Sequence, residues 1–356
     1  MSGMTPQKLE YEIAKGAFKP NIYLTNLSMA YFQDASRYVA KDIFPICPVQ
    51  LSSARYYIFS KEDLLRDNVQ RKPMFGKVTP AQMGQMDASY NCNVDQVIVG
   101  IDQISSLNFQ RTNAPGVADP RRAKAKFIAE QMLLHQDIVF AENFFQSGVW
   151  TNQWSGSTAY SESGKTFIQF DDDNCDPIVT IDNMCTEVEQ QTGRRPNRLA
   201  LGKAAFNALK ANPSVLERVK YGGASANPAT VNEKVLAEVF GIERVKVLSS
   251  IYNSAPVGAP ADMNFICDPK SALLAYATNA PAIDEPSAGY IFTWDMLGNG
   301  QYMPTLQYPG EPGTHSEFME GLFSADMQKT ADDLGIFLTN CVSDGTTGVT
   351  TDDDGE

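Results

Sequence analysis

Residue types that carry chemistry are sparse in this sequence, and few stand at a spacing that indicates a site. A Gly-Lys-Thr fragment at 164–166 matches the end of a phosphate-binding loop, but Ala159 stands where that loop needs its first glycine, and a non-helical FIQF follows. A group of aspartates could hold a hard cation, yet the glycine and terminal glutamate of a calcium loop are missing. These are Asp171, Asp172, Asp173 and Asp176. We interpret them as a solvated loop and predict no cofactor and no metal site.

The two histidines do not complete a catalytic or zinc-binding set. His135 is expected on the buried side of a helix as a core residue, whereas His315 lies in a loop near Glu317 and Glu320 without a second histidine. No GxSxG, HExxH or complete GxGxxG occurs, and no nucleophile has a recognisable partner. The absence of these motifs does not by itself exclude an enzyme, but no catalytic residues are predicted.

Composition indicates a globular chain with no preference for nucleic acid. Its 356 residues, 43% hydrophobic with a mean hydropathy of -0.26, suggest two domains or one elaborated domain, and no apolar run approaches the ~20 residues of a membrane span. The net charge of -13 disfavours a tight grip on phosphates. Six cysteines without a CxxC pair indicate free cytosolic thiols, and the N-terminus lacks the apolar core of a signal peptide.

One long helix is predicted over 119–148, and the other elements are arranged before and after it. Asp119 can cap it, Pro120 occupies the first helical position and Gly148 can end the last turn. At ~1.5 Å per residue it would be about 40 Å long. The predicted buried stripe comprises Ala123, Phe127, Leu134, Ile138, Ala141 and Phe145, widened by Ile128, Met132, His135 and Val139. Neighbouring segments such as the N-terminal arm are expected to cover part of the second side, at Ile128, Met132 and Val139.

The segment before this helix contains an arm, a helix and a long two-stranded loop. Residues 1–20 are predicted to be an arm, and 21–40 a helix with Leu24, Leu27, Tyr31, Ala35 and Tyr38 at helical spacing. KDIFPICPVQ then becomes extended at its two prolines. Segments 51–60 and 90–101 have strand character and can pair as an antiparallel ribbon. Their connection is far longer than a usual hairpin turn, so it is either an active-site lid or an arm ordered by a neighbouring subunit.

The tip of this connection combines cationic and apolar residues. It offers Arg66, Arg71, Lys72 and Lys77 beside Met74 and Phe75, and also Met83 and Met86. Mixed charge with adaptable methionines suits a docking surface better than a lid over a reaction centre.

From residue 176 onward, the sequence predicts helices and strands in the manner of an α/β domain. Helices are expected to end at Gly193, before Pro213 and at Gly241, with strands at RLALG, VKVLSS, on both sides of Asp268 to Lys270, and at SAGYIFTWD. The closing ADMQKTADDLGIFLTNCV is predicted to form a strand pair that returns to the first domain, and the acidic tail is expected to be disordered.

The order of these parts resembles the major capsid proteins of tailed bacteriophages, with the Hong Kong 97-like fold. The resemblance rests on KDIFPICPVQ, on Arg71 and Pro73 in the loop tip, on YNCNVDQVIVGID and on the helix from Pro120. It continues through RRPNRLALGKAAFNALKANPSVLERVK, VNEKVLAEVFGIERVKV, PSAGYIFTW and DLGIFLTNCV.

The resemblance implies an α+β fold with an N-terminal arm, an extended loop, a spine helix, a peripheral domain and an axial domain. It assigns 1–50 to the arm and crossing segment, 51–101 to the extended loop, and 102–175 to the peripheral domain with its spine helix at 119–148. The axial domain would be 176–308, followed by a return to the peripheral domain over 309–342 and the tail at 343–356.

The activity implied by the family is assembly of hexamers and pentamers into an icosahedral shell around double-stranded DNA. The resemblance therefore predicts a structural protein and not an enzyme. The expected inter-subunit interface is the loop tip, at Arg66, Arg71, Lys72, Met74, Phe75 and Lys77. Too few residues precede residue 21 for a fused scaffold, so we expect a separate scaffolding protein, together with a portal protein and optionally a decoration protein. Assembly would occur in the host bacterial cytoplasm, without membrane contact, to give the virion capsid.

Some family members crosslink a loop lysine to a neighbour's asparagine. Lys72, Lys77 and Asn340 are available for this, but no catalytic carboxylate is evident near them, so solvated lysines are the favoured interpretation. Two other classes stay open. One is a two-domain α/β enzyme with the 60–90 loop as a lid and His315 and Glu317 near its mouth. The other is a phage tail or decoration component.

Overall fold

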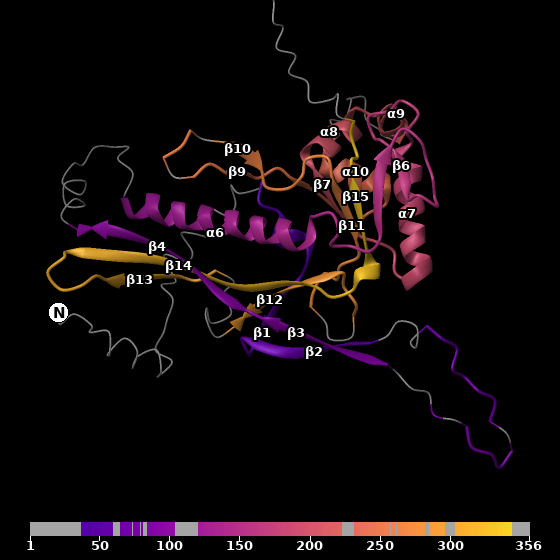
Figure 1. Cartoon of the computed structure of the whole chain (residues 1–356), viewed down its shortest axis with the longest axis horizontal. Helices are drawn as coiled ribbons and strands as arrows, with labels where there is room; N and C mark the ends of the chain where they lie inside the picture. The colour runs from indigo at the N-terminus through magenta and orange to yellow at the C-terminus, as the bar shows by residue number, and fades with distance from the viewer. Residues whose placement is uncertain are drawn as a thin grey trace, which may run out of the picture.

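The structure is a computed structural model, and it describes residues 37–59, 65–72, 74–78, 80, 84–103, 120–222, 231–256, 258–260, 262–281, 285–295 and 303–343. Two mixed sheets form the body, one beneath a long helix and one covered by four shorter helices, and a two-stranded ribbon projects from one end (Figure 1). The predicted arm at 1–20, most of the predicted helix at 21–40 and most of the acidic tail lie outside the described residues.

Helix α6 (Pro120–Phe144) is the predicted long helix, and at ~1.5 Å per residue its 25 residues extend about 37 Å. It ends four residues before Gly148, whose φ of 88° belongs to the turn that follows. The predicted Asp119 cap lies outside the described residues. Burial was predicted correctly for Ile128, Met132, Ala141 and Phe145, and the first two face the sheet beneath the helix. It was wrong for Phe127, which is 48% exposed, and for Leu134 and Ile138, which are only partly buried.

A five-stranded sheet lies beneath α6 and is organised around one long strand, β14 (Ser316–Lys329). On one side β14 pairs with β4 (Asn93–Asp102), and on the other with β12 (Gly289–Trp294) and β13 (Thr305–Pro309) in succession. Strand β1 (Ile46–Val49) pairs in parallel with β12 at the sheet edge, where Pro48 is tolerated. A Cβ on Gly321 would lie 2.5 Å from Cγ2 of Ile128. This glycine therefore permits the close approach of α6 to β14.

The second sheet has six strands in the order β6-β5-β15-β11-β7-β8. These are β5 (Gln153–Ser157), β6 (Thr166–Ile168), β7 (Arg198–Gly202), β8 (Arg244–Leu248), β11 (Ala272–Ala275) and β15 (Gly335–Thr339). Helices α7 (Pro177–Thr192), α8 (Lys203–Ala211), α9 (Pro213–Gly222) and α10 (Glu233–Phe240) supply the cluster against one face of this sheet. Strand β7 is buried at every position, because the other face packs against the core around α6.

Four short elements complete the described part of the chain. Helix α3 (Ala40–Ile43) contacts α6, β7 and β8, and the 3-10 turn η1 (Asp332–Leu334) precedes β15. Strands β9 (Ile251–Asn253) and β10 (Met263–Phe265) form a separate hairpin.

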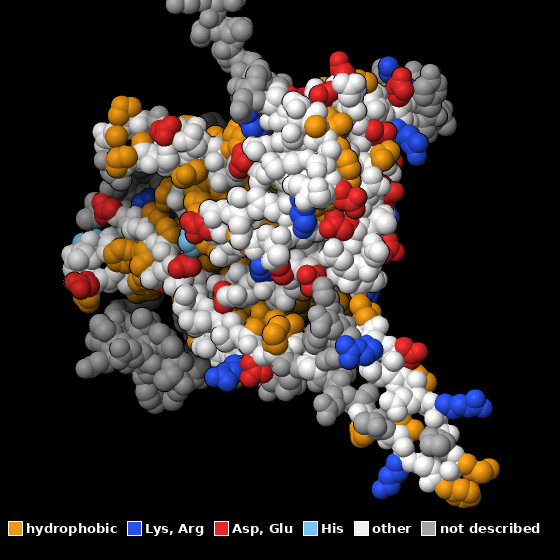
Figure 2. Space-filling model, turned by 45° about the vertical axis from the view of Figure 1, so that its right-hand side comes forward, with side chains coloured by type: hydrophobic (Ala, Val, Ile, Leu, Met, Phe, Trp, Pro, Cys, Tyr) orange, Lys and Arg blue, Asp and Glu red, His pale blue; other side chains and the backbone are white. Residues whose placement is uncertain are grey.

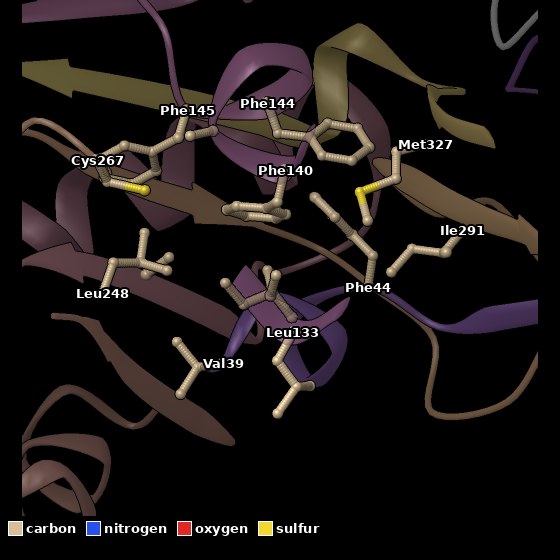
Figure 3. Packing of buried hydrophobic residues seen from close by; sticks show 14 of the residues in the cluster. Val39, Phe44, Leu133, Phe140, Phe144, Phe145, Leu248, Cys267, Ile291 and Met327 are labelled. Atoms are coloured by element: carbon tan, nitrogen blue, oxygen red, sulfur yellow. The ribbon is translucent and has the colours of Figure 1, made fainter. Parts of the chain in front are cut away.

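The core that joins both sheets is built around aromatic residues at the C-terminal end of α6. Figure 3 shows Phe44 beside Phe140 and Phe144, and its ring centroid lies 6.1 Å from the first and 4.6 Å from the second. Phe145 meets Phe337 of β15 edge-on at 5.3 Å. Helix α6 therefore contacts the sheet beneath it along its length and the six-stranded sheet at its end.

Local signals located most helix boundaries correctly. Asp176 caps α7 through the amides of Ile178 and Val179, and Gly193 ends that helix with a φ of 70°. Gly241 ends α10 in the same way, with a φ of 64°. Pro213 both follows α8 and begins α9, a helix that the sequence reading missed.

Strand partners were predicted less well. The stretch 90–101 divides at Cys92, so that β4 pairs with β14 and only residues up to Asn91 pair within the ribbon. The closing strand pair returns to the first domain only in part, because β14 lies beneath α6 whereas β15 lies between β5 and β11. Strands β12 and β13, from the predicted axial range, also lie in the sheet beneath α6. The local sequence indicates that a segment is a strand. Which sheet the strand joins depends on where its apolar side chains are buried when the chain packs.

Candidate functional site

The ribbon that carries the predicted interface consists of β2 (Ser53–Phe59) and β3 (Gln85–Asn91). Their antiparallel register runs from Ser53 opposite Asn91 to Phe59 opposite Gln85. The ribbon projects beyond both sheets (Figure 1), and an isolated two-stranded hairpin is only marginally stable in water. Its position therefore depends on how its base is attached.

The base of the ribbon is held by an aromatic cluster on the sheet beneath α6. Tyr90 stacks on Phe292 of β12 with centroids 4.8 Å apart, and Tyr56 lies 5.4 Å from the same ring. The amide of Asn91 donates to a carboxylate oxygen of Asp326 at 2.7 Å, and the amide of Cys92 donates to the carbonyl of Ser52 at 2.7 Å. Burial of the aromatic rings and these bonds give the ribbon a defined origin.

All six residues predicted for the interface lie in the connection between β2 and β3, and all six are exposed. These are Arg66, Arg71, Lys72, Met74, Phe75 and Lys77. Met74 is 89% and Phe75 99% exposed, and the φ of Phe75 is 62°, which is uncommon for an aromatic residue. The four cations form no ion pair with any other described residue. Figure 2 shows cationic and apolar side chains together at the end of the ribbon.

Three further apolar side chains extend this exposed surface. Val69 is 90% exposed, and Leu65 and Met86 are also largely exposed. The sequence signals around the tip include Met86, but nothing distinguishes Leu65 or Val69 within a polar stretch. Contiguous exposed apolar side chains on a soluble chain mark interaction surfaces more often than accidents of composition. The geometry is that of a projecting contact element whose cations pair with no other residue in the described part of the chain.

The Gly-Lys-Thr fragment and the group of aspartates, which resembled a phosphate loop and a cation site in the sequence, have structural roles. Lys165 donates to the amide oxygen of Asn152 at 2.7 Å, which places its ammonium away from a phosphate cradle. Asp176 caps α7, and Asp171 accepts a bond from the amide of Ser343 at 3.1 Å. Among the described residues no group of histidines, cysteines and acids is arranged to hold a metal ion.

The two histidines do not lie together in one site. His135 is half-exposed, and its Nε2 lies 3.1 Å from a carboxylate oxygen of Asp95 on β4, so its assignment to the core was wrong. His315 has a φ of 47° in the turn between β13 and β14. Glu317 is engaged by Arg121 at 2.7 Å and by the amide of Gln307.

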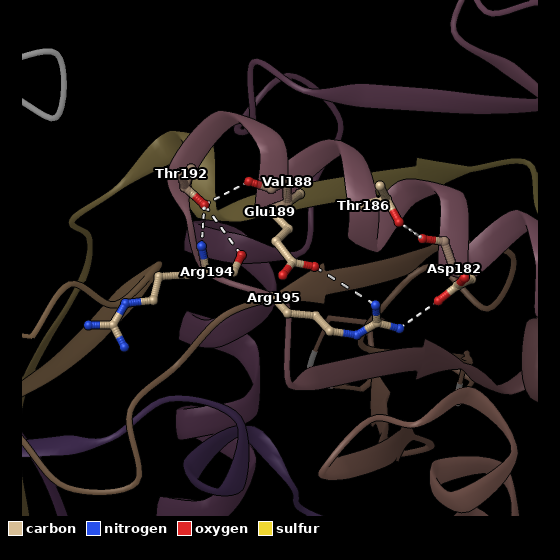
Figure 4. Close-up of polar contacts among 7 residues, drawn as sticks. All are labelled: Asp182, Thr186, Val188, Glu189, Thr192, Arg194 and Arg195. Atoms are coloured by element: carbon tan, nitrogen blue, oxygen red, sulfur yellow. Dashed lines mark hydrogen bonds and ion pairs between the residues drawn. The ribbon is translucent and has the colours of Figure 1, made fainter. Parts of the chain in front are cut away.

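The hollow that the enzyme alternative would need is shallow and is lined by residues other than those predicted. A space of about 650 Å³ lies between the turn before β7 and the end of α10, with Arg195, Asn197, Lys234, Glu238 and Glu243 in its wall. Arg195 bridges Asp182 at 2.6 Å and Glu189 at 3.9 Å on α7, as Figure 4 shows. Neither His315 nor Glu317 lines this space. Arg195 therefore holds the turn before β7 against α7.

The described cysteines are free, and burial raises the pKa of several thiols, that of Cys92 to about 11. They are therefore unreactive structural residues at neutral pH. No helix in the described part of the chain has both the length and the apolar character needed to cross a bilayer.

Comparison with known proteins gives a sequence relative and several similar solved structures. The major capsid protein of Burkholderia phage BcepMu is 21% identical over 236 residues, which are 64% of this chain and 68% of that protein. A phage-related protein from Bordetella bronchiseptica RB50 superposes with a TM-score of 0.65 at 17% identity, over 91% of this chain and 98% of that one. The capsid of cyanophage P-SCSP1u gives a TM-score of 0.49 at 14% identity, over 83% and 86% of the two chains. No protein-family model matches the chain.

These relationships confirm the predicted kinship with phage major capsid proteins and the predicted α+β fold. They also agree with the prediction of a structural protein and not an enzyme, because the sequence relative is a shell component by name.

Proposed function

We propose that this chain is the major capsid protein of a bacteriophage, which assembles through its projecting ribbon as hexamers and pentamers into an icosahedral shell around double-stranded DNA. The single observation that carries the proposal is the ribbon tip, where cations and nearly fully exposed Met74 and Phe75 have no partner among the described residues. The relationship to the BcepMu major capsid protein supports the same assignment.

The position of the tip suggests a contact with a second copy. Strand β3 continues directly into β4, so the ribbon extends one way from Cys92 and the sheet extends the other (Figure 1). A tip at one end and a receiving surface elsewhere make a heterologous contact, which closes into rings when the rotation between copies is suitable. Many modest contacts of this type, repeated around a ring, stabilise an assembly whose single contacts are weak.

The partners follow from this role and remain part of the proposal. A separate scaffolding protein would guide shell size, a portal protein would occupy one vertex, and a decoration protein could bind the finished surface. Assembly would take place in the bacterial cytoplasm and deliver the subunit to the virion capsid. The net charge of -13 suits a container that encloses DNA without adhering to it.

Reversal of charge at the tip tests the proposal. Arg71→Glu with Lys72→Glu should reduce the yield of shells or rings at least tenfold in electron micrographs and sedimentation. The two cations are proposed to face acidic groups of the next subunit, so the glutamates that replace them would be repelled. The monomer should keep its melting temperature, since neither residue contacts the folded body. Arg218→Glu with Lys220→Glu makes the same charge change on exposed α9 and should assemble normally.

The outcomes separate the classes of function. Shells or rings from the wild-type protein, with or without a scaffold, agree with a capsid subunit. Tubes would indicate a tail component, and binding only to finished shells would indicate a decoration protein. A uniformly small particle that turns over a substrate would refute the proposal. Normal shells from the Arg71/Lys72 variant would refute the assignment of this interface alone.

A further inference from the structure

Arg198 carries a positive charge that is almost completely buried. It is the first residue of β7, where it pairs with Arg244 of β8 and Ala275 of β11, and only 3% of it is exposed. One of its nitrogens, Nη2, donates to the side-chain oxygen of Asn279. Its Nε and Nη1 have no hydrogen-bond partner among the described residues. Because a buried charge costs free energy unless its donors are bonded, this guanidinium is only partly satisfied.

The nearby carboxylates compensate for this burial only in part. Nη1 of Arg198 lies 3.6 Å from Oε1 of Glu243, and the same oxygen lies 3.9 Å from Nε of Arg244. Asp42 of α3 is paired with Lys246 of β8 at 2.9 Å. Burial lowers the pKa of Arg198 from its ordinary value, and the charge of Arg244 lowers it further, whereas Glu243 and Asp42 act in the opposite direction. In this group the three cations outnumber the two carboxylates by one.

A second buried donor belongs to the segment that meets this guanidinium. Thr278 is 4% exposed, and its hydroxyl has no hydrogen-bond partner in the described part of the chain. Asn279, which binds Nη2 of Arg198, follows it directly. The side chain of Asn197 donates to the carbonyl of Ala277 at 2.8 Å and accepts from the amide of the same residue at 2.9 Å. Both donors therefore lie on chain segments that are bonded directly to each other.

The chemistry of these groups indicates the kind of ligand that would satisfy them. The N–H groups of a guanidinium can only donate, and a threonine hydroxyl can donate as well. A water molecule would accept from them but would bring two further donors into the same place. An anion accepts only, and its charge offsets the excess cation. Three other buried groups lack a described partner, at Trp154, Thr293 and Ser324, but each of these is neutral.

We propose that Arg198 and Thr278 bind a small monovalent anion of the size of chloride, which ties the 277–279 segment to β7. A monovalent ion matches the single excess positive charge, and a small ion suits two residues that are at most 4% exposed. The site belongs to the folded subunit and does not depend on shell formation. Its tests therefore use unassembled protein.

Thermal unfolding at constant ionic strength tests whether an anion binds. Stepwise replacement of gluconate, which is too large for so buried a site, by chloride should raise the melting temperature by at least about 2 °C. The rise should saturate, because a ligand that binds only the folded state stabilises it according to the occupancy of its site. A melting temperature that does not change, or that rises linearly without saturation, would overturn the proposal.

Two matched variants test whether the chloride effect arises at this site. Thr278→Val removes the hydroxyl at nearly constant shape and should raise the half-saturating chloride concentration at least threefold. Thr293→Val removes the same group from a similarly buried threonine of β12, whose hydroxyl also lacks a described partner, and should keep the wild-type response. The same half-saturating concentration in all three proteins would show that the anion binds elsewhere.

Direct detection of the ion decides the question without unfolding the protein. The wild type should broaden the NMR resonance of chloride, and Arg198→Met should remove most of that broadening because the variant lacks the buried charge. If this variant does not fold, crystals of the wild type grown in bromide give the answer, since bromide should produce an anomalous peak beside Arg198 and Thr278. A water molecule at that position in bromide, or equal chloride broadening by a folded Arg198→Met, would overturn the proposal.

Discussion

Asp137 is a carboxylate buried where helix α6, helix α3 and the connection after β8 meet. The Ser250 hydroxyl donates to it at 2.6 Å and the Ala40 amide at 3.3 Å. Burial raises its pKa to about 6, despite these two hydrogen bonds and the charge of Lys41, which lower it, and Asp42 adds a smaller upward effect. Tyr38 and Cys267 also lie within its electrostatic reach. Ionisation of Asp137 at neutral pH therefore lowers the free energy of unfolding.

The pH dependence of stability should report this residue. Its folded pKa lies above its ordinary value of 3.8, so its contribution is fully present below pH 4 and is lost as pH rises through 6. The loss is at most about 3 kcal/mol in the free energy of unfolding. Urea unfolding of unassembled protein at pH 4.5 and pH 7 should show a smaller difference for Asp137→Asn than for the wild type. Asp173→Asn, an exposed aspartate that is not among the groups acting on Asp137, should retain the wild-type difference, and equal differences in all three proteins would contradict the assignment.

Gly321 decides how closely helix α6 and strand β14 can pack. Its missing Cβ would meet Cγ2 of Ile128 at 2.5 Å, and Met132 and Val97 at 3.4 Å. The C-terminal end of helix α6 also connects the two sheets. Phe140, Phe144 and the adjacent Phe145 lie in the core that is shared with the six-stranded sheet. A change at this contact acts on the spine of the subunit and not only on one side chain.

Filling the Gly321 contact should destabilise the fold in a way that depends on Ile128. Gly321→Ala should lower the free energy of unfolding by about 1–3 kcal/mol, because the added methyl overpacks the interface. Ile128→Ala alone should also destabilise, by about 2–4 kcal/mol. The double variant should lose less than the sum, since the shortened residue 128 makes room for the methyl. Strict additivity in chemical denaturation would show that the two positions do not share this contact.

At the scale of the whole molecule, a locally cationic tip projects from a strongly acidic chain. Segment 65–78 contains four cations and one aspartate, while the chain carries a net charge of -13. Two copies therefore repel overall but attract where a tip meets an acidic surface. Salt screens both effects, because the Debye length falls from about 14 Å at 0.05 M to about 4 Å at 0.5 M. Its effect on one specific contact must be measured against a variant that lacks the charge.

Salt should therefore distinguish the electrostatic part of the tip contact from its apolar part. The assembly defect of Arg71→Ala should shrink at least threefold between 0.05 and 0.5 M salt, because screening weakens the attraction that the variant lacks. The defect of Phe75→Ser should persist at both salt concentrations, since burial of apolar surface is not screened. Light scattering during assembly measures both. A salt-independent defect for Arg71→Ala would argue against an acidic partner surface.

Local chemistry in the sequence determined several features directly. The caps at Asp176 and Gly193 and the extended backbone after Pro45 depend on residues close together in the chain, so their signals are local. The exposed tip was also predictable, because a long polar connection with isolated methionines and cations cannot form a core of its own. Its partner surface stays a prediction.

Tertiary structure alone decided which surfaces pair. Both flanks of α6 are apolar, so periodicity could not show that Ile128 and Met132 face β14 and leave Phe127 half-exposed; the glycine that makes this possible lies nearly two hundred residues away. The division of 90–101 at Cys92, and the placement of β15 between β5 and β11, likewise depend on partners distant in the chain. Each strand is apolar enough for either sheet, and only the close packing of both sheets around the end of α6 selects one arrangement.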